Sequence, residues 1–206
     1  MERMRRTGWG NLGILAICAL VLWTLAGAVA EGATTSTSFS MVRTAGLPGN
    51  CVPRATANVT IVSNGPTETM TVAVSGLPRN TDFDFFVIQV PAAPFGMSWY
   101  QGDIQTGSDG RGTGRFVGRF GIETFIVAPG TASAPTPHGN RDARSNPATK
   151  PVHTFHLGLW FNSPRDAANA HCPNVTTPFN GDHTAGPQVL NTHNFANNNG
   201  PLNRIR

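Results

Sequence analysis

One apolar stretch near the middle of the chain decides the fold, and it runs Asp82-Phe83-Asp84-Phe85-Phe86-Val87-Ile88-Gln89-Val90. Alternate residues of a strand point to opposite faces of its sheet, and both alternating sets are largely apolar here. A strand with one solvent-exposed face would alternate between polar and apolar residues. Aromatic and β-branched residues favour a strand over a helix, and Pro91 ends the run. The stretch predicts a central strand covered on both faces.

Composition and the flanking patterns indicate more short strands on either side of this one. Gly and Pro occur 23 and 16 times in 206 residues, whereas charged residues make up only 13%. Such a composition is typical of strands joined by tight loops. The patterns predict further strands at 57–61, 69–74, 97–104, 115–120, 122–127, 152–161 and 189–190, and a short helix after Ser163. We expect an all-β fold, a Greek-key, immunoglobulin-like β-sandwich, with a closed β-barrel as the alternative.

The N-terminus has the three parts of a signal peptide. Three arginines fall within the first six residues, an apolar run covers 12–29, and Ala28-Val29-Ala30 forms a small-residue cleavage site. We expect residues 1–30 to be removed and the protein to be secreted, or attached to the cell surface. The alternative is a retained membrane anchor, because the run approaches the length that spans a bilayer.

The rest of the chain divides into three parts. Residues 31–50, rich in Ser and Thr, are expected to be a linker or a loose N-terminal strand. Residues 51–194 form the β-sandwich domain, interrupted by a long proline-rich loop at 129–151. Residues 195–206 begin with an Asn-rich run and are expected to be a flexible C-terminal tail.

The cysteines agree with export. Cys18 lies in the expected signal peptide, which leaves Cys51 and Cys172. Two cysteines in a secreted chain most simply form one disulfide, and two free thiols are the alternative.

The net charge of +4 owes much to the N-terminus. The first 30 residues hold three of the 15 basic and one of the 11 acidic residues, so the remainder carries about +2. This gives no support for nucleic acid as a partner, and a membrane would be contacted only through an uncleaved leader.

Several strings resemble a group of secreted bacterial proteins that has no established activity. They are Ser75-Gly76-Leu77-Pro78, the Phe83–Pro91 run, Trp99-Tyr100-Gln101-Gly102-Asp103-Ile104, the Gly114–Phe120 run and His156-Leu157-Gly158-Leu159-Trp160-Phe161. The resemblance covers most of the chain after residue 30. It implies secretion and a shared fold, and it assigns no site residues.

Metal sites have little support in the sequence. The six histidines are His138, His153, His156, His171, His183 and His193. No His-Glu-x-x-His or paired Cys-x-x-Cys string accompanies them, so we expect no metal. If a metal binds, the pair to test is His156 with His183 or His193. The turn around Asp109 supplies too few oxygens for calcium and is better explained as a hairpin.

Catalytic patterns are equally sparse. No Gly-x-Ser-x-Gly elbow occurs. Asp103 and Glu123 could share a face as the two carboxylates of a glycosidase, but turn-forming and structural roles explain most of the few acids better. We therefore expect no catalytic residues.

The aromatic residues give the strongest functional hint. Trp99, Tyr100 and Trp160 lie on or beside expected strands, with Asp103 nearby to bind hydroxyl groups. Tryptophan and tyrosine are amphipathic and suit sugar stacking, although they are also common in sandwich cores. We expect a non-enzymatic module with a structural, adhesive or binding role toward an extracellular molecule or glycan, without a cofactor. A carbohydrate-binding module is one alternative, and a metal-dependent or hydrolytic enzyme is another.

Overall fold

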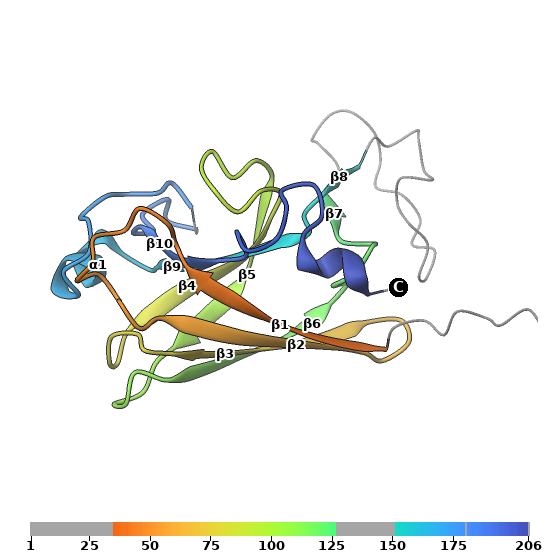
Figure 1. The fold of residues 1–206 in the computed structure, drawn as a ribbon, viewed down its shortest axis with the longest axis horizontal. Helices are drawn as coiled ribbons and strands as arrows, with labels where there is room; N and C mark the ends of the chain where they lie inside the picture. Colours follow the sequence, from red (N-terminus) through yellow and green to blue (C-terminus); the bar gives the residue numbers. More distant parts are fainter. Residues whose placement is uncertain (1–34, 127–150, 180, 206) are drawn as a thin grey trace, which may run out of the picture. The chain divides into compact units, whose positions relative to one another are not determined.

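The computed structural model describes residues 35–126, 151–179 and 181–205. These residues form strands and two short helices, in the order β1 (Ser36–Arg43), β2 (Thr56–Ser63), β3 (Glu68–Ser75), β4 (Asp82–Ile88), β5 (Ser98–Gln105), β6 (Gly112–Gly118), β7 (Phe125–Ile126), β8 (Val152–His153), β9 (His156–Phe161), α1 (Pro164–Asn169), β10 (Gln188–Asn191) and the 3₁₀ helix η2 (Pro201–Arg204) (Figure 1). The expected signal peptide and nearly all of the 129–151 loop lie outside the described residues.

Eight strands make one antiparallel sheet in the order β5-β4-β9-β10-β1-β2-β3-β6. Its two halves meet at β1, where residues 36–41 pair with β2 and Val42 and Arg43 pair with β10. The edge strands β5 and β6 also approach each other, because a Cβ added to Gly114 would lie 2.8 Å from Ile104 Cγ1. The fold is an all-β sandwich that nearly closes into a barrel, which confirms the expected fold class.

Strand β4 is the central strand that the sequence predicts. It pairs with β5 on one side and β9 on the other, and every residue after Asp82 is buried. Its inner residues Phe83, Phe85 and Val87 belong to the main core. Its outer face lies in a second apolar cluster, formed by Phe86, Ile88, Trp160 and Ala185 with Phe95 and Phe179 packed against them. Both faces are therefore shielded from solvent, the inner face by the main core and the outer face by the second cluster.

For the described part of 31–50, the alternative of a linker is wrong, and an N-terminal strand is formed that is well packed rather than loose. Residues 36–43 form β1, which holds the two halves of the sheet together. Phe39 and Met41 are buried, whereas Ser38 and Ser40 face solvent. Two apolar residues at period two suffice for a half-buried strand, and the surrounding Ser and Thr residues obscured them.

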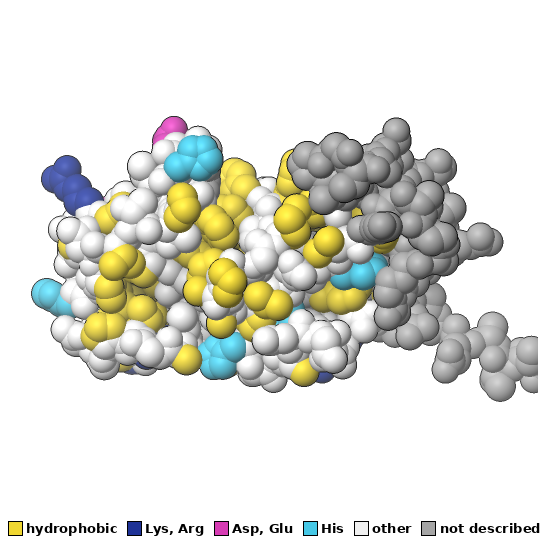
Figure 2. Space-filling view, turned by 90° about the horizontal axis from the view of Figure 1, so that it is seen from above, with side chains coloured by type: hydrophobic (Ala, Val, Ile, Leu, Met, Phe, Trp, Pro, Cys, Tyr) yellow, Lys and Arg dark blue, Asp and Glu magenta, His cyan; other side chains and the backbone are white. Residues whose placement is uncertain are grey.

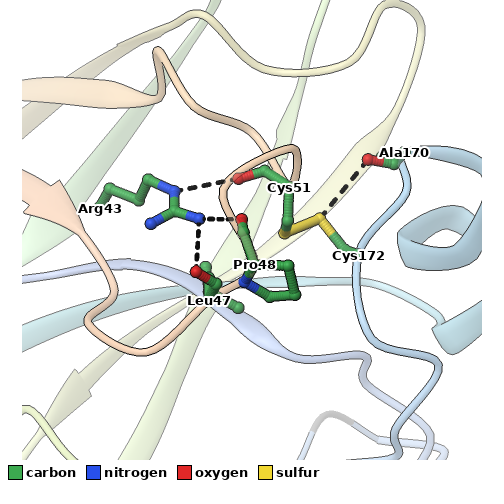
Figure 3. Close-up of a disulfide and its surroundings, with 6 residues drawn as sticks. All are labelled: Arg43, Leu47, Pro48, Cys51, Ala170 and Cys172. Carbon is green, nitrogen blue, oxygen red and sulfur yellow. Dashed lines mark hydrogen bonds between the residues drawn. A yellow bond between two sulfur atoms is a disulfide. The ribbon is translucent and has the colours of Figure 1, made fainter.

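Cys51 and Cys172 form the predicted disulfide, which links the loop after β1 to the residues after α1 (Figure 3). Arg43 holds the same loop. Its guanidinium donates hydrogen bonds to the carbonyls of Cys51 at 3.0 Å and Leu47 at 2.9 Å, and also to that of Pro48. One cation thus binds three carbonyls of the loop, and the Cys51 N–H also donates to Pro48 O at 2.9 Å, so the loop reaches the bridge in a fixed position.

The expectation of a flexible tail at 195–206 is also wrong for the described residues. Helix η2 places Leu202 in the core with no exposed surface, and Ile205 follows it with 1% exposed. The Leu202 N–H donates to Phe155 O at 3.2 Å, and the Ile122 N–H donates to Ile205 O at 3.1 Å. The Asn-rich run before η2 resembles a disordered segment in composition, but the apolar residues beyond it fill the end of the sandwich.

Two predicted strands are shorter than expected. The range 122–127 contributes only the two residues of β7 among those described, and 152–161 is divided into β8 and β9 at Thr154 and Phe155. Helix α1 is confirmed. The Ser163 hydroxyl caps it by accepting from the Asp166 N–H, at 3.2 Å.

Candidate functional site

A β-bulge in β5 sets the direction of the side chains around the candidate site. The register with β4 shifts between Phe85 and Phe86, which face Gly102 and Tyr100, so Gln101 is the extra residue. Because the bulge changes the alternation by one residue, Tyr100 and Asp103 lie on the same outer face. The Tyr100 hydroxyl donates to Asp103 Oδ1 at 2.6 Å. Without the bulge the two side chains would point to opposite faces.

Gly102 makes this bulge possible. Its φ of +146° is disfavoured for residues with a side chain, and a Cβ there would meet the Phe116 ring at 3.1 Å. The Phe116 ring itself stacks on Phe85, with centroids 5.1 Å apart. A glycine inside a strand pattern often marks a bulge, and Gly102 does so here.

The site lies where β5 and β6 diverge beyond this point, and we call it the edge cavity. It has a volume of about 630 Å³, within the range of small-molecule sites. One wall comes from β4 and β5, and the other from β6 and the residues that follow it. Its described lining residues are Val87, Trp99, Gln101, Val117, Gly118, Arg119, Phe120, Glu123, Thr124, Phe125, Ile126 and Thr154.

The second wall is held by backbone hydrogen bonds. The Phe120 N–H donates to the buried carboxylate of Glu68 at 2.8 Å, and the Gly121 N–H donates to Thr124 Oγ1 at 2.8 Å. The Thr124 hydroxyl in turn donates to Arg119 O. The wall is also fastened by the C-terminal residues, through the hydrogen bond from Ile122 to Ile205 described above. A wall tied at several points can keep a cavity open without a ligand.

The structure divides the four residues that the sequence grouped as a ligand-binding set. Trp99 is 63% exposed and lines the edge cavity. Tyr100 and Asp103 lie on the opposite face of β5, as a pair. Trp160 is fully buried. The four residues therefore do not form one binding surface.

The prediction of Trp160 as a ligand-binding residue is wrong. The strand pattern placed it correctly on the face away from Phe155 and Leu157. Two loops cover that face. The ring centroids of Phe95 and Phe179 each lie 5.1 Å from the ring centroid of Trp160. A ligand has no access to this indole.

Tyr100 is poorly suited to proton transfer. Burial raises the pKa of its hydroxyl above the ordinary value, and the hydrogen bond and negative charge of Asp103, followed by Asp84, raise it further. The hydroxyl therefore stays protonated at neutral pH and serves as a donor to Asp103.

The proposed metal pair of His156 with His183 or His193 is not formed. His156 is fully buried, and its Nδ1 lies 2.9 Å from Thr192 Oγ1, while its Nε2 lies 3.2 Å from the carbonyls of Ala196 and Asn197. Both ring nitrogens are therefore occupied. Within 35–126, 151–179 and 181–205, no group of three or more His, Cys, Asp or Glu could hold a metal ion. His138 lies outside these ranges.

His156 has a predictable effect on stability. Burial lowers the pKa of its imidazole below 6.5, although the contacting backbone groups oppose this shift. The unfolded chain binds a proton near pH 6.5, whereas the folded chain does not, so falling pH favours unfolding. We expect the stability to be constant above about pH 7 and to fall below it, by no more than about 1.4 kcal/mol per pH unit for this one proton.

Urea unfolding at pH 7.5, 6.5 and 5.5 measures this dependence. The variant H156Q lacks the titrating group and should lose most of the decline, whereas H183A removes an exposed histidine and should keep it. A decline of equal slope in H156Q would show that other groups cause it.

The candidate carboxylates Glu123, Asp103 and Asp109 lie in different parts of the structure. Glu123 lies in the wall of the edge cavity, whereas Asp103 is on the outer face with Tyr100, so the two carboxylates do not share a face. Asp109 lies in the hairpin turn, where its Oδ1 accepts from the Arg111 N–H at 3.1 Å. This is the turn geometry that the sequence favoured over calcium binding.

Sequence reasoning missed most of the cavity lining. Of the twelve described lining residues, the predicted binding set contains only Trp99. Thr154 carried no signal, because an isolated Thr between two strands has no distinctive pattern. Only Gly102, as a bulge marker, indicated that residues around 100 would leave the regular sheet.

No helix among the described residues is long and apolar enough to cross a membrane. No protein-family model matches the chain, and a comparison with curated proteins also finds no match. The structure is that of an all-β, disulfide-linked domain with a cavity between the two edge strands of its sheet.

Proposed function

We propose that this protein is a non-enzymatic binding module that acts outside the cell and holds its ligand in the edge cavity. The observation that carries the proposal is the position of Trp99. A large aromatic side chain that is 63% exposed loses favourable burial, and it stands at the rim of a cavity. Exposed tryptophan at a concave site is typical of binding surfaces.

The chemistry of the lining supports binding over catalysis. Among the described residues that line the cavity, Arg119 and Glu123 alone are charged. Glycoside hydrolysis generally needs two carboxyl groups, and nucleophilic catalysis needs an activated side chain beside a base. The described lining offers one carboxyl group and no His or Cys. We therefore expect a bound molecule to be released unchanged.

Two features support an extracellular location. The Cys51–Cys172 disulfide is stable in oxidising compartments and rare in the cytosol. The N-terminal sequence has the three parts of a signal peptide. The surface adds a consistent feature, since the face in Figure 2 carries few charged side chains between apolar and neutral polar regions. Such a surface favours contacts with uncharged material.

The test follows the indole N–H resonance of Trp99 by NMR in the isotope-labelled full chain, assigned by its loss in W99F. The probes are neutral tetrasaccharides and the anionic aromatic dye anilinonaphthalene sulfonate. We expect at least one probe to shift this resonance and to be recovered unchanged. If neither the sugars nor the dye perturbs Trp99 at millimolar concentration, the edge cavity is not a binding site.

A further inference from the structure

We infer that the edge cavity is a carbohydrate site, in which one pyranose ring packs against Trp99 while its hydroxyl groups meet the polar residues of the walls. This inference rests on the proposed function and names its ligand class. It differs from the aromatic set expected from the sequence, because Tyr100 and Trp160 take no part in it.

Trp99 supplies the apolar surface that a sugar ring needs. One face of a pyranose presents C–H groups, while the hydroxyl groups project from its edge. An indole offers a flat π surface that suits the C–H face. The apolar residues Val87 and Val117 also line the cavity, and Val117 is 60% exposed. The site thus combines one aromatic platform with a partly apolar wall.

The polar residues suit a neutral ligand with many hydroxyl groups. The Gln101 amide can donate and accept, and the lining also includes the carboxylate of Glu123 and the guanidinium of Arg119. The formal charges of these last two cancel, so the described lining attracts neither anions nor cations as a class. An entirely apolar ligand would offer no hydrogen-bonding group to these polar side chains.

Thr154 provides an independent indication of a polar ligand. It lines the cavity with no exposed surface, and its backbone N–H donates to Thr124 O at 3.1 Å. Among the described residues, however, its hydroxyl has no hydrogen-bond partner. Buried hydroxyl groups in proteins are nearly always paired, and an unpaired one is unfavourable. A ligand hydroxyl that reached Thr154 Oγ1 from the cavity would give it the partner that the described residues do not supply.

The outer face of β5 is a weaker candidate for the same ligand. The Tyr100 hydroxyl is already engaged by Asp103 at 2.6 Å, and Trp160 is sealed beneath Phe95 and Phe179. Among the described residues of that face, Tyr100 is therefore engaged by Asp103 and Trp160 is covered, so neither is a free aromatic platform. Tyr100 and Trp99 are consecutive residues that point to opposite faces, which makes Tyr100 a matched control.

The experiment measures the affinity of the full chain for neutral tetrasaccharides of β-linked glucose, xylose and N-acetylglucosamine by titration calorimetry. We expect at least one to bind. W99A should weaken that binding at least about tenfold, because the platform is lost. T154V keeps the shape of the side chain but removes the hydroxyl, and should weaken binding about three- to tenfold without lowering the midpoint of thermal unfolding. Y100A should bind as the parent protein does.

The dye separates this inference from the proposed function. If the dye binds at Trp99 and none of the sugars does, the cavity binds ligands but the carbohydrate assignment is overturned. If a sugar binds with equal affinity in the parent, W99A and T154V, the sugar site lies elsewhere and the assignment to the edge cavity is overturned. Sugar binding that is lost in W99A and retained in Y100A supports the inference.

Discussion

Replacing Cys51 and Cys172 together by alanine should lower the free energy of unfolding by roughly 2–5 kcal/mol, the typical effect of removing a native disulfide. The bridge joins residues 121 positions apart, so it restricts the unfolded chain over more than half of its length. In the chain-entropy description, the stabilisation increases with the length of the closed loop. The bridge also fixes the loop that Arg43 holds by three carbonyls, and that loop would be released.

Urea unfolding of the double variant, compared with the oxidised parent, measures this effect. The parent treated with a reducing agent should lose nearly as much stability, whereas the reducing agent should not affect the double variant. Both sulfurs are in buried residues, so the truncation to alanine also removes some packing, and the reduced parent separates the two contributions. A double variant as stable as the oxidised parent would show that the bridge contributes no net stability.

Truncating Leu202 to alanine should cost about 2–5 kcal/mol, as expected for a fully buried leucine whose removal leaves a cavity. Leu202 is followed by only four residues of the sequence and has no exposed surface. The control is N203A, which changes the neighbouring residue of the same short helix. The Asn203 side chain makes one exposed hydrogen bond, to Asn199 at 3.1 Å, so its loss should alter stability by no more than about 0.5 kcal/mol.

A second measurement connects this helix to the edge cavity. The Ile122 N–H donates to Ile205 O, so loosening of η2 should increase amide hydrogen exchange at Ile122. Equal stability and equal exchange in L202A and N203A would mean that the C-terminal residues are not part of the folded core. Such a result would restore the interpretation of a flexible tail.

The sequence predicted the parts of the fold that depend on local pattern. The double-sided burial of residues 83–88 and the strands β2 and β3 follow from alternation, and the short helix follows from the capping chemistry of Ser163. The disulfide followed from the cysteine count. These features need no knowledge of what lies far away in the chain.

The parts that failed depend on contacts between distant segments. Trp160 was assigned to the correct face, but its burial comes from Phe95 and Phe179, which belong to loops without a recognisable period. Leu202 and Ile205 follow an Asn-rich run, and only the open end of the sandwich gives them a place to pack. The edge cavity arises where two strands diverge, so its lining could not be collected from any single stretch of sequence.

Strand β1 pairs with β2 in one half of the sheet and with β10 in the other, and this has a consequence for biosynthesis. This strand is among the first parts of the domain to be made, yet Val42 pairs with Asn191, which is among the last. The half made of β1, β2, β3 and β6 can pair before β10 has been made, whereas the half that contains β9 and β10 cannot be completed until residues 188–191 are available. Contacts of such long sequence separation slow folding. The joining of the two halves at β1 is therefore expected to be a late step in the folding of this domain.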